Sequence, residues 1–153
     1  VGRDLAKYFY QQAFDGFTEA MQAVRLPLRE DWICHLEDLN PIKGYAAARR
    51  MLDARETPTA FVVVRDMLAG GVIHAIEERG LSPGHDISVI SFDDCSWPEG
   101  RKLLTTYHAP YYEIGVAAAD RLTEAVEYGQ RPQGHCWFDA PLRMRKTVGL
   151  PKV

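Results

Sequence analysis

The 153-residue chain has little cysteine: three residues, Cys34, Cys95 and Cys136. Three scattered cysteines are too few for a disulfide framework, and they lack the paired C-x-x-C spacing typical of a structural zinc site. They indicate reduced thiols and favour a cytoplasmic location. No purely apolar run approaches the ~18 residues that a membrane span needs, and no charged segment precedes an apolar one at the N-terminus.

Several functional motifs are also missing. The sequence contains no G-x-G-x-x-G, Walker or G-x-S-x-G motif, which argues against a phosphate-binding loop and a nucleophilic triad. Lys and Arg do not cluster and the formal net charge is -3, which argues against a polyanion-binding surface spread over the chain. The five histidines show no ligand spacing, so we expect neither a metal nor another cofactor. The composition, 46% apolar and 25% charged, is that of an ordinary globular domain.

What the sequence does contain is a βαβ pattern in residues 58–94, PTAFVVVRDMLAGGVIHAIEERGLSPGHDISVISFDD. The apolar run Ala60 to Val64 predicts a fully buried strand, and apolar residues at helical spacing predict a helix from Met67 to Arg79. Ile87 to Phe92 predicts a second, parallel strand after a right-handed crossover. Open α/β sheets bind ligands at the carboxyl ends of their strands. Four charged residues are expected on that rim: Arg65, Asp66, Asp93 and Asp94.

Similar patterns predict the other elements. Helices are expected at residues 4–24, at 40–55 with Asn40 as N-cap, and at 114–126 before Gly129. Short strands are expected at 32–36, 104–108, 136–138 and 142–148, and a loop at 97–100. This alternation indicates an α/β fold with a doubly wound parallel sheet.

The charged residues of the rim allow different roles. Asp93 and Asp94 could form a general acid/base pair or a magnesium site, but adjacent residues at a strand end usually point in different directions. Asp66 directly precedes a helix, where capping of backbone N–H groups is the favoured role. Arg65 ends a buried strand, so its guanidinium must find an anion or reach water, and either Asp93 or a ligand could serve.

The run 58–94 resembles the effector-binding domains of the lac repressor and galactose repressor family. Members usually have an apolar strand, an Asn-Asp pair, a helix and then D-I-S-V-x-G-[FY]-D-[DN]. The resemblance extends to four further segments: Asp15-Gly16-Phe17, Leu104-Thr105-Thr106, the Ala-rich helix after Gly115, and Arg145-Lys146-Thr147. It implies a two-lobed, periplasmic-binding-protein-like fold.

The resemblance also implies how the chain divides. Residues 1–103 would belong to the C-terminal lobe, residues 104–130 would be a crossover strand and helix of the N-terminal lobe, and residues 131–153 would return to the C-terminal lobe. We therefore expect this sequence to be a fragment. The family's helix-turn-helix DNA-binding domain and the first half of its two-lobed domain would lie outside it.

Four positions form the ligand site that the resemblance implies. Asp93 matches the family aspartate that hydrogen-bonds the effector, whereas Arg65 replaces a usual Asn and Ala13 a usual Arg. Leu39, the fourth, stands at a position that is aromatic in some members. Outside these four, Ala109 stands at a usually polar position. Because Arg binds planar anions bidentately, these departures predict an effector with a carboxylate or phosphate.

The resemblance implies a non-enzymatic sensing and dimerisation module of a transcriptional regulator. Its partners would be a small-molecule effector, a sugar or an anionic sugar derivative, and a second subunit that contacts the exposed side of residues 67–79. Operator DNA would bind only through the DNA-binding domain. Two alternatives stay open: a periplasmic sugar-binding protein of the same architecture, and an enzyme that uses Asp93 and Asp94.

Overall fold

The computed structural model describes residues 3–36, 38–95, 103–129, 131 and 133–150. Its elements are α1 (Arg3–Ala23), the 3-10 turn η1 (Glu30–Trp32), α2 (Pro41–Leu52), β1 (Ala60–Val63), α3 (Asp66–Glu78), β2 (Ser88–Asp93), β3 (Thr105–His108), α4 (Tyr111–Tyr128) and β4 (Leu142–Arg143). Among these described residues, no helix combines the length and the hydropathy that crossing a bilayer requires.

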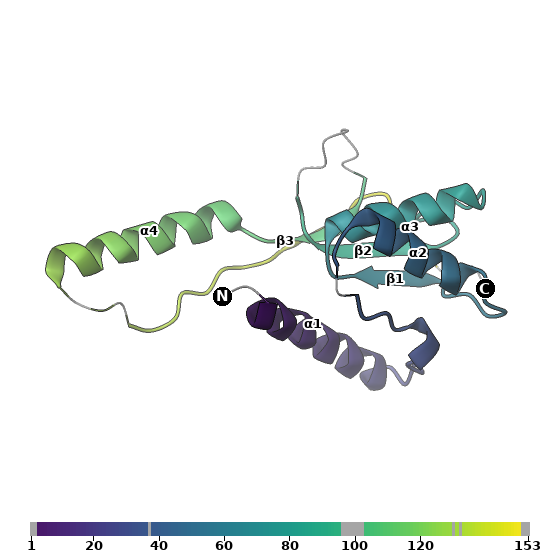
Figure 1. The fold of residues 1–153 in the computed structure, drawn as a ribbon, viewed down its shortest axis with the longest axis horizontal. Coiled ribbons are helices and arrows are strands. Elements are labelled where there is room, and N and C mark those ends of the chain that lie inside the picture. Colours follow the sequence, from purple (N-terminus) through teal and green to yellow (C-terminus); the bar gives the residue numbers. More distant parts are fainter. Residues whose placement is uncertain (1–2, 37, 96–102, 130, 132, 151–153) are drawn as a thin grey trace.

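The four strands form one sheet in the order β1-β2-β3-β4 (Figure 1). β1 pairs with β2 and β2 with β3 in parallel, so the predicted βαβ unit is confirmed. β4 pairs antiparallel with β3, and the sheet is therefore mixed and mostly parallel. The carboxyl ends of β1, β2 and β3 consequently meet at one edge of the sheet, where the predicted rim lies.

The hydrophobic core lies where α2 and α3 pack together on the sheet. Asn40 caps α2 as predicted, because its side-chain Oδ1 accepts a 3.0 Å hydrogen bond from the Lys43 N–H. The two helices approach closely at Gly71, where a Cβ would lie 1.9 Å from the Pro41 carbonyl oxygen. α3 ends at Glu78, two residues before the predicted Gly80, whose φ of 70° favours glycine. The buried apolar residues are Ala48, Met51, Leu52, Phe61, Val63, Leu68, Ala69, Val72, Ala75, Ile76, Ile87, Val89 and Leu104.

Helix α1 confirms the prediction for residues 4–24 but lies apart from the sheet, beyond β1 (Figure 1). An apolar cavity of about 390 Å³ is lined by α1, the segment that follows it, β1 and α2. The sheet face on that side is incompletely covered. Val62 of β1 is 44% exposed, so the prediction of a fully buried first strand is wrong.

Two predicted strands are absent. Residues 32–36 form the end of η1 and an extended segment, because no backbone hydrogen bond of the described chain joins 33–36 to the edge of β1. Residues 136–138 are also irregular, and Trp137 is 88% exposed there. The strand predicted at 142–148 is only Leu142–Arg143, and the loop predicted at 97–100 lies outside the described residues. An alternating pattern forms a strand only where a neighbour supplies hydrogen bonds.

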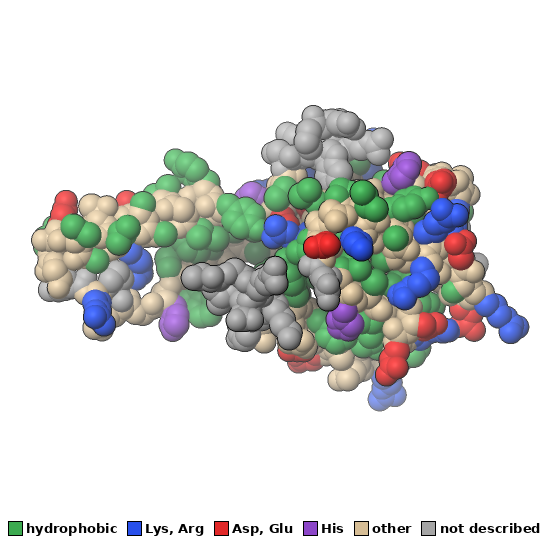
Figure 2. Space-filling view, in the orientation of Figure 1, with side chains coloured by type: hydrophobic (Ala, Val, Ile, Leu, Met, Phe, Trp, Pro, Cys, Tyr) green, Lys and Arg blue, Asp and Glu red, His purple; other side chains and the backbone are tan. Residues whose placement is uncertain are grey.

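Helix α4 confirms the prediction of an amphipathic helix and includes residues 114–126. It ends at Gly129, which has a φ of 63°. The helix projects away from the sheet (Figure 1), and none of its described residues is buried. Hydrophobic side chains are therefore visible along it in the space-filling view (Figure 2).

Candidate functional site

Asp93 is the last residue of β2, and its carboxylate stands at the centre of the rim. It is 5% exposed. The Arg65 Nε lies 3.2 Å from Asp93 Oδ2, and the Tyr111 hydroxyl donates a 2.9 Å hydrogen bond to Asp93 Oδ1. Arg65 follows β1 and Tyr111 begins α4, so three separate elements bring these side chains together. Asp93 therefore supplies the anion that the guanidinium of Arg65 was expected to find.

Burial governs the protonation of this group. It raises the pKa of the Asp93 carboxyl, while the hydrogen bond from Tyr111 and the charge of Arg65 oppose that rise. Burial and the hydrogen bond to Asp93 raise the pKa of Tyr111 to about 12. The phenol therefore keeps its proton at neutral pH and acts as a donor to the carboxylate.

Asp93 and Asp94 turn to different partners, as the sequence predicts for adjacent residues. Their φ angles are 128° and 56°, a backbone conformation that non-glycine residues adopt rarely and at a cost in energy. Asp94 pairs with His108 Nδ1 at 3.1 Å and with Arg145 Nη2 at 2.6 Å, which ties β3 and the segment after β4 to the end of β2. No group of three or more His, Cys, Asp or Glu in the described part of the chain is arranged to hold a metal ion.

The prediction that Asp66 caps its own helix is wrong. Arg65 is the N-cap residue, and the buried Asp66 carboxylate accepts hydrogen bonds from Ser91 Oγ, from Thr106 Oγ1 at 3.0 Å and from the Cys95 N–H at 2.8 Å. The hydroxyls of two neighbouring strands lie inside the protein and need an acceptor, and Asp66 supplies it.

The other two predicted site residues carry apolar side chains. Leu39 is partly buried and packs against the core, and Ala13 lines the cavity beside α1. No hydrogen bond or ion pair of the described residues joins either to Arg65 or Asp93. Tyr111 is not among the predicted site residues, because an aromatic residue type alone does not separate a packed side chain from one that lines a pocket. The available signal was its position after β3, whose end reaches the same rim.

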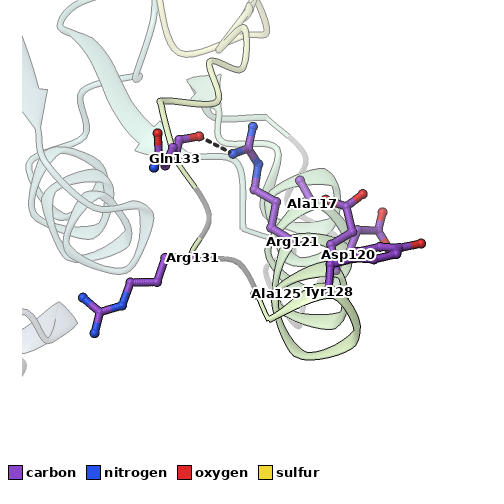
Figure 3. A pocket seen from close by; sticks show the side chains of 8 residues that line it. Ala117, Asp120, Arg121, Ala125, Tyr128, Arg131 and Gln133 are labelled. Carbon is purple, nitrogen blue, oxygen red and sulfur yellow. Dashed lines mark hydrogen bonds between the residues drawn. The ribbon is translucent and has the colours of Figure 1, made fainter.

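A separate pocket of about 840 Å³ lies between α4 and the segment that follows it (Figure 3). Its lining is largely polar, and Arg121 Nη1 donates a 3.1 Å hydrogen bond to the Gln133 carbonyl oxygen across it. The lining residues are Ala117, Asp120, Arg121, Glu124, Ala125, Tyr128, Arg131 and Gln133. None of them belongs to the rim, so this pocket and the rim are distinct places in the fold.

The mostly parallel α/β sheet, with polar side chains at its strand ends, belongs to a periplasmic-binding-protein-like domain. The family model with that description matches residues 4–148. A LacI transcriptional regulator from Bacillus cereus subsp. cytotoxis superimposes with a TM-score of 0.82, covering 91% of this chain and 49% of that one, at 24% identity. That likeness concerns the fold.

Relatives of higher identity define the family. The HTH-type transcriptional repressor PurR of Glaesserella parasuis serovar 5 is 37% identical over 128 residues, which are 80% of this chain and 37% of the relative. The lac repressor dimer is 32% identical with a TM-score of 0.66, covering 74% of this chain and 40% of that one. The chain belongs to the LacI/GalR family and forms part of its effector-binding domain. It spans less than half the length of the curated relatives it matches.

Proposed function

We propose that this chain is the effector-sensing and dimerisation part of a cytoplasmic transcriptional regulator that acts without covalent chemistry. The supporting observation is Asp93, a buried carboxylate at a strand end beside Arg65. The lac repressor to which the chain is similar is described as a dimer bound to operator and an anti-inducer. An effector would act by binding one conformation of the regulator more tightly than the other and so shifting its operator affinity.

The proposed effector is a sugar or an anionic sugar derivative. Arg65 uses Nε toward Asp93, and its Nη atoms form no hydrogen bond among the described residues. The side chain as a whole is 40% exposed, so solvent reaches part of it. Two parallel N–H groups on one edge suit a carboxylate or phosphate. Asp93 would accept a hydroxyl, and Leu39 and Ala13 would complete the site.

The lobe division predicted from the resemblance puts residues 104–130 in the N-terminal lobe and residues 1–103 and 131–153 in the C-terminal one. Because β3 pairs with β2 in the sheet, α4 is the part of 104–130 that we propose for the N-terminal lobe. Apolar side chains of α4 support this proposal, because Ile114 is 41%, Leu122 65% and Val126 76% exposed. A contiguous apolar surface of this kind marks a contact with another part of the protein. The N-terminal lobe would supply that contact.

The homodimer is proposed to use the outer side of α3. Met67, in the first turn of α3, is 53% exposed although the helix buries most of its apolar residues. A large apolar side chain on the outer side of a well-packed helix fits an interface. Operator binding would require the DNA-binding domain of the full-length protein.

The test uses the full-length protein that contains this chain. A thermal-shift screen of sugars, sugar acids and sugar phosphates should find a compound that raises the melting temperature and changes operator binding. Asp93→Ala should then weaken its binding by roughly 1.5–3 kcal/mol, the worth of a hydrogen bond to a charged group. Arg65→Asn should weaken an anionic compound more than a neutral one, whereas Arg55→Asn, at an exposed position, serves as the control.

Two results would contradict the proposal. Unchanged affinity of Asp93→Ala in calorimetry would remove that carboxylate from the site. A full-length protein that carries a secretion signal and binds no DNA in a mobility-shift assay would instead be a periplasmic sugar-binding protein.

A further inference from the structure

Both carboxylate oxygens of Asp93 are already occupied. Arg65 takes Oδ2, and Tyr111 donates to Oδ1 at 2.9 Å. Tyr111 is the first residue of α4. Of the side-chain hydrogen bonds within the described residues, the one from Tyr111 links α4 to the sheet. The site is therefore filled from within by a side chain of the helix that projects away from it (Figure 1).

The two partners of Asp93 differ in how readily an effector could replace them. Arg65 carries the positive charge that the buried Asp93 carboxylate needs, so an effector is not expected to replace it. Its Nη atoms can bind an anionic group of the effector at the same time. Tyr111 offers one neutral O–H, because its pKa is raised to about 12. Tyr111 is 55% exposed whereas Asp93 is 5% exposed, so solvent reaches the phenol more easily than the carboxylate. A sugar hydroxyl can supply the same kind of O–H.

We infer that Tyr111 is an internal occupant of the effector site, whose hydroxyl holds the place of an effector hydroxyl on Asp93 until the effector displaces it. This inference rests on the proposed function. It narrows the effector to a polyhydroxy compound with an acidic group, whose hydroxyl donates to Asp93 Oδ1 while its acid binds the Nη edge of Arg65. The bond between Arg65 Nε and Asp93 stays in place throughout.

Displacement has a consequence for regulation. Tyr111 lies in the first turn of α4, so breaking its bond to Asp93 releases this end of the helix from β2. The Ala109 N–H keeps a 3.3 Å backbone hydrogen bond to the Asp93 carbonyl oxygen, which makes the residues after β3 a natural pivot. Effector binding and the position of α4 are thereby coupled through one carboxylate.

The experiment measures binding by calorimetry with full-length protein and three acidic probes, D-glucuronate, D-gluconate and D-ribose 5-phosphate, with D-glucose as the neutral comparison. Tyr111→Phe removes only the hydroxyl that competes for Asp93. The variant should bind at least one acidic probe about tenfold more tightly than the wild type, the worth of one such hydrogen bond. Tyr112→Phe, at a neighbouring residue that is 81% exposed, should match the wild type.

Equal or weaker binding by Tyr111→Phe, or no binding of any acidic probe to either protein, would overturn the inference. A double-mutant cycle with Asp93→Asn in urea unfolding tests the bond itself, and zero coupling would also overturn it. The proposed function fails separately. The Tyr111 tests may fail while a compound from the screen still changes operator binding and Asp93→Ala abolishes that effect. In that case the proposed function is supported and only the inference about Tyr111 is wrong. If no compound changes operator binding, the proposed function falls.

Discussion

Helices α3 and α4 invite comparison because each follows a parallel strand and carries apolar residues at helical spacing. α3 packs its apolar face against α2 and the sheet and buries Leu68, Val72 and Ile76 completely or nearly so. α4 projects from the sheet and buries nothing among its described residues (Figure 1). Helical periodicity thus specifies a helix and its apolar face, but it does not specify which surface covers that face. For α3 the covering surface is in this chain, and for α4 we propose that it is in the other lobe.

The largest effect on stability should come from shortening a buried side chain of α3. Ile76 is 0% exposed, so Ile76→Ala leaves a cavity and should lower the free energy of unfolding by about 4 kcal/mol. Leu122→Ala on α4 should cost roughly 1–3 kcal/mol in the full-length protein, because the proposed lobe covers Leu122 there. Urea unfolding of both variants measures the difference. A Leu122→Ala cost below about 0.5 kcal/mol, as at an open surface, would contradict the assignment of α4 to the other lobe.

A second contrast concerns glycine. A Cβ on Gly71 of α3 would lie 1.9 Å from the Pro41 carbonyl oxygen and 2.6 Å from the Tyr45 nitrogen, so α2 must move. Gly71→Ala should therefore lose on the order of 3 kcal/mol. Gly115 of α4 has no atom within 4 Å of such a Cβ, and Gly115→Ala should gain up to about 1 kcal/mol from helix propensity. Thermal unfolding of the full-length variants checks both signs, and a loss at Gly115 would place it against the proposed lobe.

The βαβ unit and α4 could be predicted because their signals are local. The valines of Ala60–Val63, the apolar spacing of α3 and the left-handed Gly80 and Gly129 each act within a few residues. The family pattern in residues 58–94 added the position of Asp93 at the end of β2, which the structure shows.

What the sequence could not give depends on partners distant along the chain. The segment 33–36 alternates like a strand but finds no ladder on β1, and 136–138 finds none either. Asp66 is the first residue of α3, yet its carboxylate points inward because it accepts hydrogen bonds from hydroxyls of β2 and β3. Tyr111 reaches Asp93 across 18 positions. Local rules describe what a side chain can do, and the tertiary contacts decide which of those roles it takes.

The smallest expected effect is a change in the slope of the unfolding free energy against pH. It tests the Asp93 carboxylate, which contacts residues at the start of both α3 and α4. Burial raises the pKa of Asp93 above its ordinary value of 3.8, so the folded protein holds this proton more tightly than the unfolded chain does. The stability that the protonated Asp93 carboxyl contributes to the folded protein is fully present below pH 3.8. It is lost as the pH rises through the pKa of the folded state. Asp93→Asn cannot titrate, so the unfolding free energy of the wild type should fall relative to this variant as pH rises above 3.8.

Tyr111→Phe sharpens the same measurement from the side of α4. The hydrogen bond from Tyr111 favours the charged carboxylate and so lowers the pKa of Asp93 against the effect of burial. Removing the hydroxyl should raise that pKa further and extend the loss of stability to higher pH. The measurement is urea unfolding of the wild type, Tyr111→Phe and Asp93→Asn at a series of pH values. It gives the pH range over which each protein loses stability. A relative rise of wild-type stability over this range would mean that burial does not raise the pKa of Asp93. A Tyr111→Phe curve that parallels the wild type would mean that α4 does not hold Asp93 in solution.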